Sequence, residues 1–424
     1  MDKIMKHYRN IDRCRVCECD SLDTVLKIDE QYLSPTFVKT NKNNFLSQIK
    51  VPLTLVLCRN CKLLQLKETV NPDLLYKDYF YRTSINDTMR NDLKALVDSC
   101  LHQAAPSPND IVLDIGANDG TMVSFFPSNL RRVGVEPAEN IDWSSVEDSI
   151  TIVNDYFSQK ALESVLQEDK VKIITSCAMF YDIDKPNEFV QDIKRILHKD
   201  GLWCIQLSYL PLMLSNMNIY DICNEHLEYY SLHSLQYLMD KNGLNIFHAE
   251  ENGVNGGSIK VFISHKEKNT PLTQNFKSLY KKEDELNLNE VETYFGFKNK
   301  ANYIKETVCA YIKNEQDNGN LVIGLGASTK GNMLLQFFGI GKEIIASISE
   351  RNPDKVGLRT LGTDMELISE EDARNLNPSC MVVLPWYFKE EIIKREKEYV
   401  ENGGKLLIPM PYPHVITNEG ELLL

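Results

Sequence analysis

Four cysteines near the N-terminus form two C-x-x-C pairs, Cys14 with Cys17 and Cys58 with Cys61. This spacing lets one tight turn present two thiolates to a single ion, and two such turns complete the closed tetrahedral site of structural zinc. Cys19 competes with Cys17 as a ligand, but the regular pairing favours Cys17. Buried free cysteines or a redox pair would leave the two matched pairs unexplained. We therefore expect one structural zinc ion bound by the two pairs.

A second pattern with chemical content begins in the segment 111–115. Three apolar residues lead to Asp114, and Gly116 and Gly120 follow. Glycines directly after a strand allow a sharp turn and let a ligand approach the backbone. Because a carboxylate repels anions, Asp114 argues against a phosphate at this turn. It suits a ligand with a cationic amine and hydroxyls.

The next apolar segment, 132–136, ends in another acid, Glu136. That position lies about 20 residues after the glycines, where doubly wound folds place the carboxylate that binds ribose hydroxyls. The acid, the glycines and the second acid together resemble the S-adenosylmethionine site of class I methyltransferases. An NAD site and a plain strand–turn–helix are the alternatives, but the G-x-G-x-x-G spacing is not met. The residues expected to bind S-adenosylmethionine are Asp114, Gly116, Asn118, Gly120, Glu136 and Pro137.

Glu225 and His226 are the residues best suited to move a proton. A histidine takes a proton near neutral pH, and a carboxylate can tune or orient it. The same pair also occurs on surface turns, so residue type alone leaves both roles open. Tyr76, Tyr79 and Tyr81 lie in an aromatic segment that either packs in the core or gives hydroxyls to a ligand.

These residues need a scaffold, and apolar strands alternate with helical stretches through the middle of the chain. That alternation predicts a parallel, doubly wound sheet, in which ligands lie at the carboxyl ends of the strands. A helix led by Ser231 follows His226, and a strand at 51–58 leads into the second cysteine pair. The middle strands are expected at 111–115, 132–136, 172–177 and 202–207.

A second strand–glycine–helix pattern opens the last part of the chain. The apolar segment 321–325 meets Gly324, Gly326 and Gly331, and a helical stretch follows. Backbone amides at such a helix start attract an anion, and Lys330 adds positive charge. The spacing is not that of a Walker A loop. Further strands at 344–348, 380–384 and 404–408 predict a second Rossmann-type domain, whose ligand is a dinucleotide, a nucleotide sugar or none.

Composition limits the classes of protein to which the chain can belong. The chain has 424 residues, 43% of them apolar and 25% charged, with a formal net charge of −13. These are globular values, and the acidic balance argues against nucleic-acid binding. No apolar run has the length of a membrane span, and residues 1–10 carry no apolar signal core. We expect a cytoplasmic monomer with domains at 1–70, 71–255 and 256–424.

Taken together, the motifs are similar to those of the sugar C-methyltransferases that make 3-C-methyl deoxysugars. The resemblance covers essentially the whole chain. The joint order of the motifs is specific. They are the two cysteine pairs, the segments 114–120 and 134–138, Glu225-His226 with Tyr229-Tyr230-Ser231, Gly256-Gly257-Ser258, the segment 324–332, Trp386-Tyr387-Phe388, Gly403-Gly404-Lys405 and Pro409-Met410-Pro411.

The resemblance implies an α/β protein: a class I methyltransferase sheet, an N-terminal zinc-binding module that helps to bind substrate, and a C-terminal Rossmann-like domain that closes over a nucleotide sugar. The substrate would be a dTDP- or GDP-linked 4-keto-6-deoxy sugar. His226 would take the proton at C3 with Glu225 and Tyr76 beside it, and the enolate would attack the methyl group of S-adenosylmethionine. The implied substrate-binding residues are Tyr79, Tyr81, Asn255, Ser258, Lys260, Ser328, Lys330 and Asn332.

The chain departs from the family pattern around this site. Cys223 and Asn224 stand where tyrosine and histidine are usual, and Asp182 replaces a histidine. Asn255 and Lys260 replace histidine and arginine. Two alternatives therefore stay open. One is methylation of another position or a different keto sugar, and the other is a nucleotide-sugar-binding relic without activity.

Overall fold

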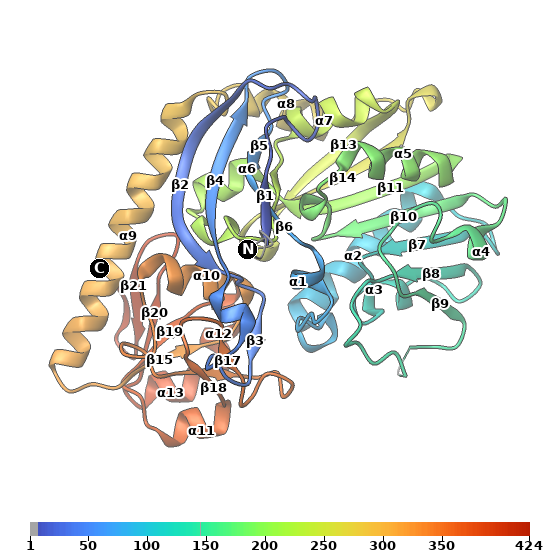
Figure 1. The fold of residues 1–424 in the computed structure, drawn as a ribbon. Helices are drawn as coiled ribbons and strands as arrows, with labels where there is room; N and C mark the ends of the chain where they lie inside the picture. Colours follow the sequence, from blue (N-terminus) through green and yellow to red (C-terminus); the bar gives the residue numbers. More distant parts are fainter. Residues whose placement is uncertain (1–6, 145) are drawn as a thin grey trace, which may run out of the picture.

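The computed structural model describes residues 7–144 and 146–424. Residues 1–6, part of the segment for which the sequence predicts no signal, and residue 145 lie outside the described residues. Figure 1 shows a methyltransferase sheet on one side, a C-terminal sheet on the other, and long N-terminal strands beside the C-terminal sheet. No helix of the described chain is long and apolar enough to cross a membrane.

The middle of the chain forms a seven-stranded sheet with the order β13-β14-β11-β10-β7-β8-β9. All strands run parallel except β14, which is antiparallel to both neighbours. One reversed strand next to the edge of a parallel sheet is the topology of class I methyltransferases. The strands are β7 (Ile111–Ile115), β8 (Arg131–Val135), β9 (Ile150–Val153), β10 (Val171–Cys177), β11 (Leu197–Ser208), β13 (Leu244–Asn252) and β14 (Ser258–His265).

Helices cover both faces of this sheet, so its strands carry apolar side chains on both sides. Val112 packs on the face of α2 (Asp87–Ala104), and its neighbour Leu113 packs on the opposite face with α5 (Pro186–Ile196). Ser231 caps helix α7, which begins at Leu232, as the sequence predicts. The remaining helices here are α3 (Thr121–Ser124), α4 (Glu163–Leu166), α6 (Leu210–Ser215), α7 (Leu232–Lys241) and α8 (Gln274–Glu283), with short 3-10 turns η2 (Thr83–Ile85), η3 (Phe180–Asp182), η4 (Ile219–Asp221), η5 (Val254–Gly256) and η6 (Lys266–Lys268).

The N-terminal region forms a four-stranded antiparallel sheet with the order β12-β5-β4-β2. Its edge strand β12 (Glu228–Tyr229) belongs to the middle of the chain and follows His226 by two residues. The other strands are β2 (Leu22–Tyr32), β4 (Lys50–Cys58) and β5 (Leu64–Leu66); β1 (Tyr8–Asn10) pairs with β6 (Glu68–Val70), and η1 (Phe45–Gln48) and α1 (Asp73–Tyr76) complete the region.

The C-terminal sheet has nine strands in the order β22-β21-β20-β19-β15-β16-β18-β17-β3. The five from β20 to β18 are parallel, as the predicted Rossmann-type pattern requires. The strands are β15 (Val322–Leu325), β16 (Ser347–Glu350), β17 (Arg359–Thr360), β18 (Glu366–Ser369), β19 (Cys380–Val383), β20 (Lys405–Ile408), β21 (His414–Thr417), β22 (Gly420–Leu423) and β3 (Phe37–Val38). The helices are α9 (Val291–Asp317), α10 (Thr329–Phe338), α11 (Glu370–Asn375), α12 (Lys389–Arg395) and α13 (Lys397–Glu401), with η7 (Trp386–Phe388).

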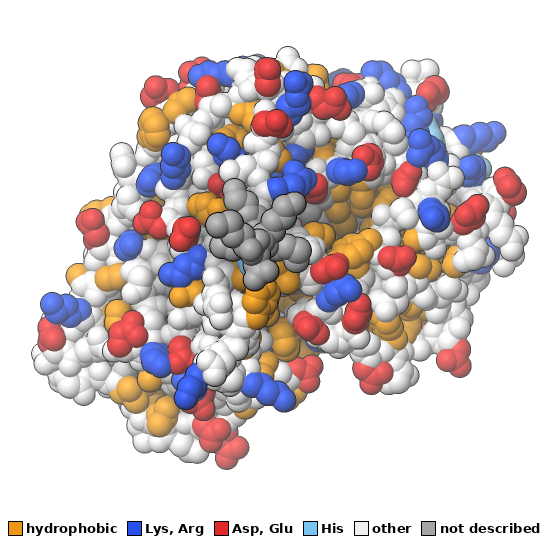
Figure 2. All heavy atoms as spheres, in the orientation of Figure 1, with side chains coloured by type: hydrophobic (Ala, Val, Ile, Leu, Met, Phe, Trp, Pro, Cys, Tyr) orange, Lys and Arg blue, Asp and Glu red, His pale blue; other side chains and the backbone are white. Residues whose placement is uncertain are grey.

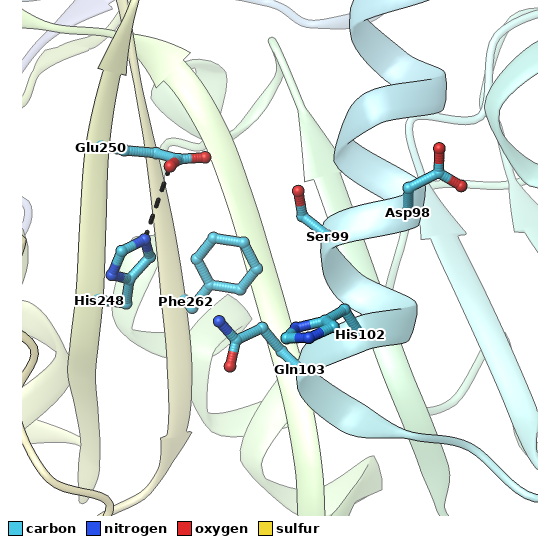
Figure 3. A pocket seen from close by; sticks show the side chains of 7 residues that line it. All are labelled: Asp98, Ser99, His102, Gln103, His248, Glu250 and Phe262. Carbon is cyan, nitrogen blue, oxygen red and sulfur yellow. Dashed lines mark ion pairs between the residues drawn. The ribbon is translucent and has the colours of Figure 1, made fainter.

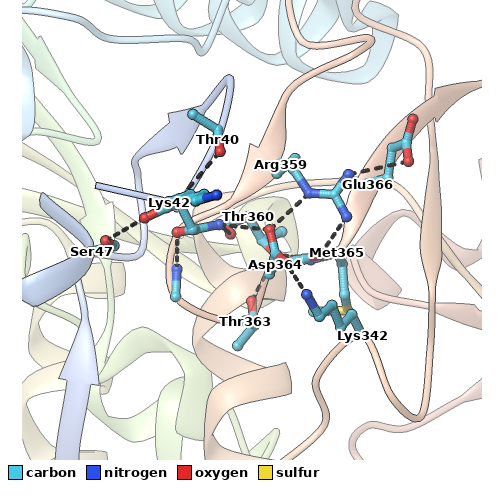
Figure 4. Close-up of polar contacts among 12 residues, drawn as sticks. Thr40, Lys42, Ser47, Lys342, Arg359, Thr360, Thr363, Asp364, Met365 and Glu366 are labelled. Atoms are coloured by element: carbon cyan, nitrogen blue, oxygen red, sulfur yellow. Dashed lines mark hydrogen bonds and ion pairs between the residues drawn. The ribbon is translucent and has the colours of Figure 1, made fainter. Parts of the chain in front are cut away.

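The N-terminal region is tied to this sheet by more than β3. Figure 4 shows the polar contacts around Asp364, where the loop after β3 meets the hairpin that joins β17 to β18. The Asn41 amide donates to Thr360 O at 3.0 Å and to Asp364 Oδ1 at 3.1 Å. Its own oxygen accepts from Gly362 N at 2.7 Å. The first and last parts of the chain therefore form a continuous structure.

The predicted division between residues 255 and 256 falls in the turn that leads into β14. This strand begins at Ser258 and pairs with β11 and β13, so residues 258–265 complete the methyltransferase sheet. Helix α8 packs on β13. The glycine loop at 253–257 is a turn within this sheet.

Candidate active site

The four predicted metal ligands lie together at the start of the chain. The Sγ atoms of Cys14, Cys17, Cys58 and Cys61 all lie within 4.8 Å of one another. Two turns present them, with Glu18 N donating to Cys14 O and Lys62 N donating to Cys58 O. Four thiols converging in this way fit a closed tetrahedral zinc site. The Gln65 side-chain amide donates to Cys14 Sγ at 3.2 Å, which favours a thiolate there.

The glycine turn after β7 has the conformation that the sequence predicts. Gly116 and Gly120 have φ of +76° and +78°, a region that other residues rarely adopt. A Cβ added at Gly116 would lie 3.0 Å from Met179 Cγ. The turn is fastened to the next strand, because Gly116 N and Ala117 N both donate to Val135 O. A ligand at the carboxyl end of β7 therefore meets bare backbone.

Asp114 lies at the end of β7 and is 2% exposed. Its Oδ1 accepts a hydrogen bond of 2.9 Å from the Thr175 hydroxyl on β10. Burial raises the pKa of Asp114 to about 7, and the nearby Glu136 adds to this effect. A buried carboxyl group with one neutral partner suits a cationic group of a ligand, which would favour its ionised form.

Glu136 follows β8 and fixes the backbone of two loops. Its carboxylate accepts from Asn118 N at 2.8 Å and from Ala138 N at 2.9 Å, around half-buried Pro137. Burial raises its pKa. The Asn118 side chain in turn accepts from Thr83 N at 3.1 Å. The predicted cofactor residues thus gather at the carboxyl ends of β7 and β8, where Glu136 holds the backbone of Asn118 and Gly120 N donates to Ala117 O in the same turn.

A loop from α1 to η2 covers this cofactor site. The Asn118 amide donates to Tyr81 O at 3.0 Å, and the Asn140 side chain bonds to the backbone of Tyr79 in both directions. The same loop reaches the C-terminal sheet, where Asn352 donates to Phe80 O at 3.2 Å. Tyr79 and Tyr81 therefore belong to a segment held by both sheets.

Glu225 and His226 are 4% and 7% exposed, so they are not on a surface turn. The His226 ring lies against Tyr181, with ring centroids 4.2 Å apart, and Leu227 N donates to Tyr181 O at 2.8 Å. The Tyr76 hydroxyl donates to Glu225 O at 3.4 Å. The carboxyl end of β10 thus holds the predicted proton-transfer segment.

Burial shifts the pKa values of Glu225 and His226 in opposite directions, which gives the two residues different protonation states. Burial, reinforced by the positive charge of Lys330, lowers the pKa of His226 to about 3. Burial raises the pKa of Glu225 to about 8, against the opposing charge of Lys330 and the Thr329 hydroxyl. At pH 7 the imidazole of His226 is therefore neutral, while the Glu225 carboxyl group holds a proton.

Lys330 joins the C-terminal sheet to this segment. Its Nζ forms an ion pair of 2.7 Å with Asp221 Oδ1 and donates to Asn255 O at 2.9 Å. The rings of Tyr220 and Tyr387 flank the ammonium, each with its centroid 5.3 Å from Nζ. The ion pair with Asp221 raises the pKa of Lys330. Lys330 and Asn255, two of the predicted substrate residues, are thus in contact through the Asn255 backbone oxygen.

The other predicted substrate residues have structural partners. Ser328 caps α10 by accepting from Gly331 N at 3.0 Å, and the Ser258 hydroxyl donates to Val254 O at 2.9 Å. The Asn332 amide donates to Ser34 O of the N-terminal region at 2.9 Å. Lys260 forms an ion pair with Glu250 on the α2 face of the sheet.

The Lys260–Glu250 pair borders a shallow cleft of about 300 Å³ between α2 and the β13–β14 edge. Figure 3 shows His248 paired with Glu250 beside Phe262, and His102 on the opposite wall. Figure 2 shows hydrophobic side chains gathered between the methyltransferase sheet and the N-terminal strands. Sequence reasoning missed Thr175 and Asp221, since no spacing marks these residues, and it noted Asp182 only as a departure from the family pattern.

Comparison with known proteins agrees with this geometry. Three families match successive parts of the chain: "Putative zinc binding domain" at residues 14–76, "Methyltransferase domain" at 86–249 and "C-methyltransferase C-terminal domain" at 253–411. The C-methyltransferase NovU of Streptomyces niveus is 28% identical over 416 residues, which are 98% of this chain and 99% of that protein.

Two solved structures each match about two fifths of the chain. The YcgJ protein from Bacillus subtilis is 15% identical, with a TM-score of 0.32, and the match covers 41% of this chain and 97% of that one. Magnesium protoporphyrin IX methyltransferase from Synechocystis is 10% identical, with a TM-score of 0.33, and the match covers 42% and 88%. The strand order, rather than these likenesses, carries the fold assignment.

The strand order, the four-cysteine cluster and the three matched regions define an S-adenosylmethionine-dependent methyltransferase with a zinc-binding module. The match to the C-methyltransferase C-terminal domain and the similarity to NovU over nearly its whole length narrow the class to C-methyltransferases. These matches fit the sugar C-methyltransferase family with an N-terminal zinc module, which the motifs of the chain resemble. The predictions of S-adenosylmethionine and zinc as cofactors are confirmed.

Proposed function

We propose that the protein transfers the methyl group of S-adenosylmethionine to C3 of a nucleotide-linked 4-keto-6-deoxy sugar, in deoxysugar biosynthesis. The observation that carries the proposal is the buried Glu225-His226 segment at the carboxyl end of β10, with its imidazole neutral at physiological pH. NovU, which spans the same length, is a C-methyltransferase by name.

The ketone explains why such a segment is useful. Carbon becomes a nucleophile when a neighbouring carbonyl can hold negative charge as an enolate. His226 accepts the C3 proton, and C3 then attacks the methyl carbon while the C–S bond breaks and its electron pair stays on sulfur. The enolate beside the imidazole raises the pKa of His226 during the reaction, because opposite charges favour the charged form. Glu225 is protonated at pH 7, so it orients the site rather than acting as the base.

Lys330 and Asn255 support a sugar nucleotide as the substrate. The ammonium lies between the two sheets and next to the Glu225-His226 segment. A substrate that carries a diphosphate and a ketone would find one cation at this junction and the tyrosine-rich loop of Tyr79 and Tyr81 beside the cofactor turn. Ser258, Lys260, Ser328 and Asn332 complete the proposed set, and a substrate would have to compete with their present partners Val254, Glu250, Gly331 and Ser34.

A second candidate is methylation of another ketone-activated position or a different keto sugar. It is favoured by Asn224, whose two buried amide atoms have no hydrogen-bond partner in the described structure. The Asn224 amide offers both a donor and an acceptor without a partner, two residues before His226. These atoms fit a substrate whose polar group differs from the one that the usual histidine at this position would bind.

The test is methylation of a panel of thymidine- and guanosine-diphosphate-linked 4-keto-6-deoxy sugars, followed by mass spectrometry and by NMR of the methylated carbon. Replacement His226→Asn should retain binding of S-adenosylhomocysteine and lower the rate about 10²–10⁴-fold, the usual contribution of a positioned base. Exchange of the C3 proton with solvent deuterium should fall with it. His102→Asn, an exposed histidine on α2, is the matched control. Methylation at a carbon other than C3 would select the second candidate.

A further inference from the structure

Asp182 lies beside the proposed base but is not used by the mechanism so far. It ends η3, directly after β10, and its neighbour Tyr181 stacks against His226. Asp182 therefore lies at the same sheet edge as Asp114, on the side of the Glu225-His226 segment. A group at this place can reach a substrate that His226 deprotonates.

The carboxyl group of Asp182 has an incomplete set of partners. Its Oδ1 is fully shielded from solvent and has no hydrogen-bond partner among the described residues. The Tyr76 hydroxyl is the one neutral donor acting on the group. A buried polar atom without a partner costs free energy unless a ligand supplies one. The unmet oxygen belongs to the residue next to Tyr181, whose ring contacts the proposed base His226.

The charges around Asp182 favour its neutral form. Burial raises its pKa well above the ordinary range, and the carboxyl groups of Glu225 and Glu228 raise it further. Arg15 of the N-terminal region pairs with Asp184 and lies near Glu228. Lys330 acts on Glu225 and His226. The titratable groups that face Asp182 are Tyr76, Tyr79, Tyr181, Cys223, Glu225, Glu228 and Tyr229.

We propose that Asp182 is a further catalytic residue, which donates a hydrogen bond as a carboxylic acid to the ketone oxygen of the substrate while His226 takes the adjacent proton. This rests on the proposed function. The C–H bond breaks, its proton moves to the imidazole, and its electron pair passes to the ketone oxygen as the enolate. Methyl transfer restores the ketone, so the Asp182 proton stays where it began. A neutral acid that stabilises an oxyanion is an established catalytic device.

The chemistry explains why aspartate can serve where the family has histidine. A developing oxyanion is stabilised by a donor that is already in place, and removing one such donor typically costs about 10²–10³ in kcat. A carboxylate at this position would repel the enolate. Burial is the main reason that Asp182 keeps its proton.

The experiment compares Asp182→Asn with Asp182→Ala on whichever keto sugar of the panel the wild-type enzyme methylates. Asn keeps a neutral donor, so it should lose far less activity than Ala. The Ala variant should lose about 10²–10³-fold in kcat with little change in KM. Deuterium exchange at the acidic carbon, measured without S-adenosylmethionine, should fall in parallel. At alkaline pH the wild-type kcat should fall as Asp182 ionises, and the Asn variant should lack this fall.

Controls separate this idea from folding and from the proposed function. S-adenosylhomocysteine affinity and circular dichroism should match wild type in both variants, and exposed Asp142→Asn should change nothing. Wild-type kcat in Asp182→Ala would overturn the role of Asp182, and so would equal losses in both variants with the alkaline fall retained. A wild-type enzyme that methylates no keto sugar would instead reject the proposed function.

Discussion

Cofactor binding should depend on the protonation of Asp114. A cationic amine prefers a carboxylate, so a proton on Asp114 competes with the cofactor. Affinity should therefore be constant above the pKa of about 7 and fall as the pH drops below it. Without the cofactor, burial favours the protonated form of the Asp114 carboxyl group. The cationic amine of the cofactor would favour the ionised form instead.

The size of the effect follows from the same pKa. At pH 5 the group is about two pH units below its pKa, and each unit corresponds to about 1.4 kcal/mol. Because half of the groups are already protonated at pH 7, we expect affinity to fall about 50-fold between pH 7 and pH 5, or roughly 2.3 kcal/mol. S-adenosylhomocysteine retains the amine and is stable, so it is the appropriate ligand for the measurement.

Isothermal titration calorimetry in buffers of different ionisation enthalpy would measure both the affinity and the protons released. Near pH 6, binding to the wild-type protein should release a proton, and binding to Asp114→Asn should not. Burial raises the pKa of Glu136 as well, so Glu136→Gln is the matched control and should keep the proton release. A flat affinity between pH 5 and pH 7, or the same slope in Asp114→Asn, would refute the reasoning.

Three further outcomes are expected. Chelation of zinc or the substitution Cys58→Ser should unfold the N-terminal module, because the free energy of metal binding there stabilises the fold. Circular dichroism would detect the unfolding. The substitution Cys19→Ser should retain one zinc per chain by elemental analysis. Glu136→Ala should weaken S-adenosylhomocysteine binding by about 1.5–3 kcal/mol in calorimetry, the range for hydrogen bonds to a charged group; unchanged affinity would contradict its role. Lys330→Met should raise the pKa of His226, because a nearby positive charge is removed, and NMR of the imidazole would detect this; an unmoved resonance would show that the lysine does not act on the base.

Local patterns predicted much of the fold. Three local features could be predicted because each depends on residues a few positions apart. They are the glycine turn after Asp114, the cap at Ser231 and the turn within each cysteine pair. The strand at 111–115 was placed with its observed bounds. Residue type and spacing suffice where the contacts are local.

Contacts between distant segments were not predictable in the same way. Strand β14 was assigned to the C-terminal domain, because only its pairing with β11 reveals its sheet. The ion pair of Lys330 with Asp221 joins residues more than a hundred positions apart, and nothing in either neighbourhood marks the partner. The environment of Asp182 likewise depends on groups from several elements. Burial and pKa are properties of the assembled site.

The placement of β12 gives the metal an influence on turnover. Glu228 of β12 pairs with Gln65 of β5, and the Gln65 side chain donates to Cys14 Sγ. Leu66 N also donates to Leu227 O, next to His226, at 2.8 Å. The backbone that carries the base is therefore registered against the strand beside the metal site. When zinc is withdrawn gradually, the rate of methyl transfer should decline in proportion to bound zinc, while cofactor affinity, which depends on β7 and β8, should persist.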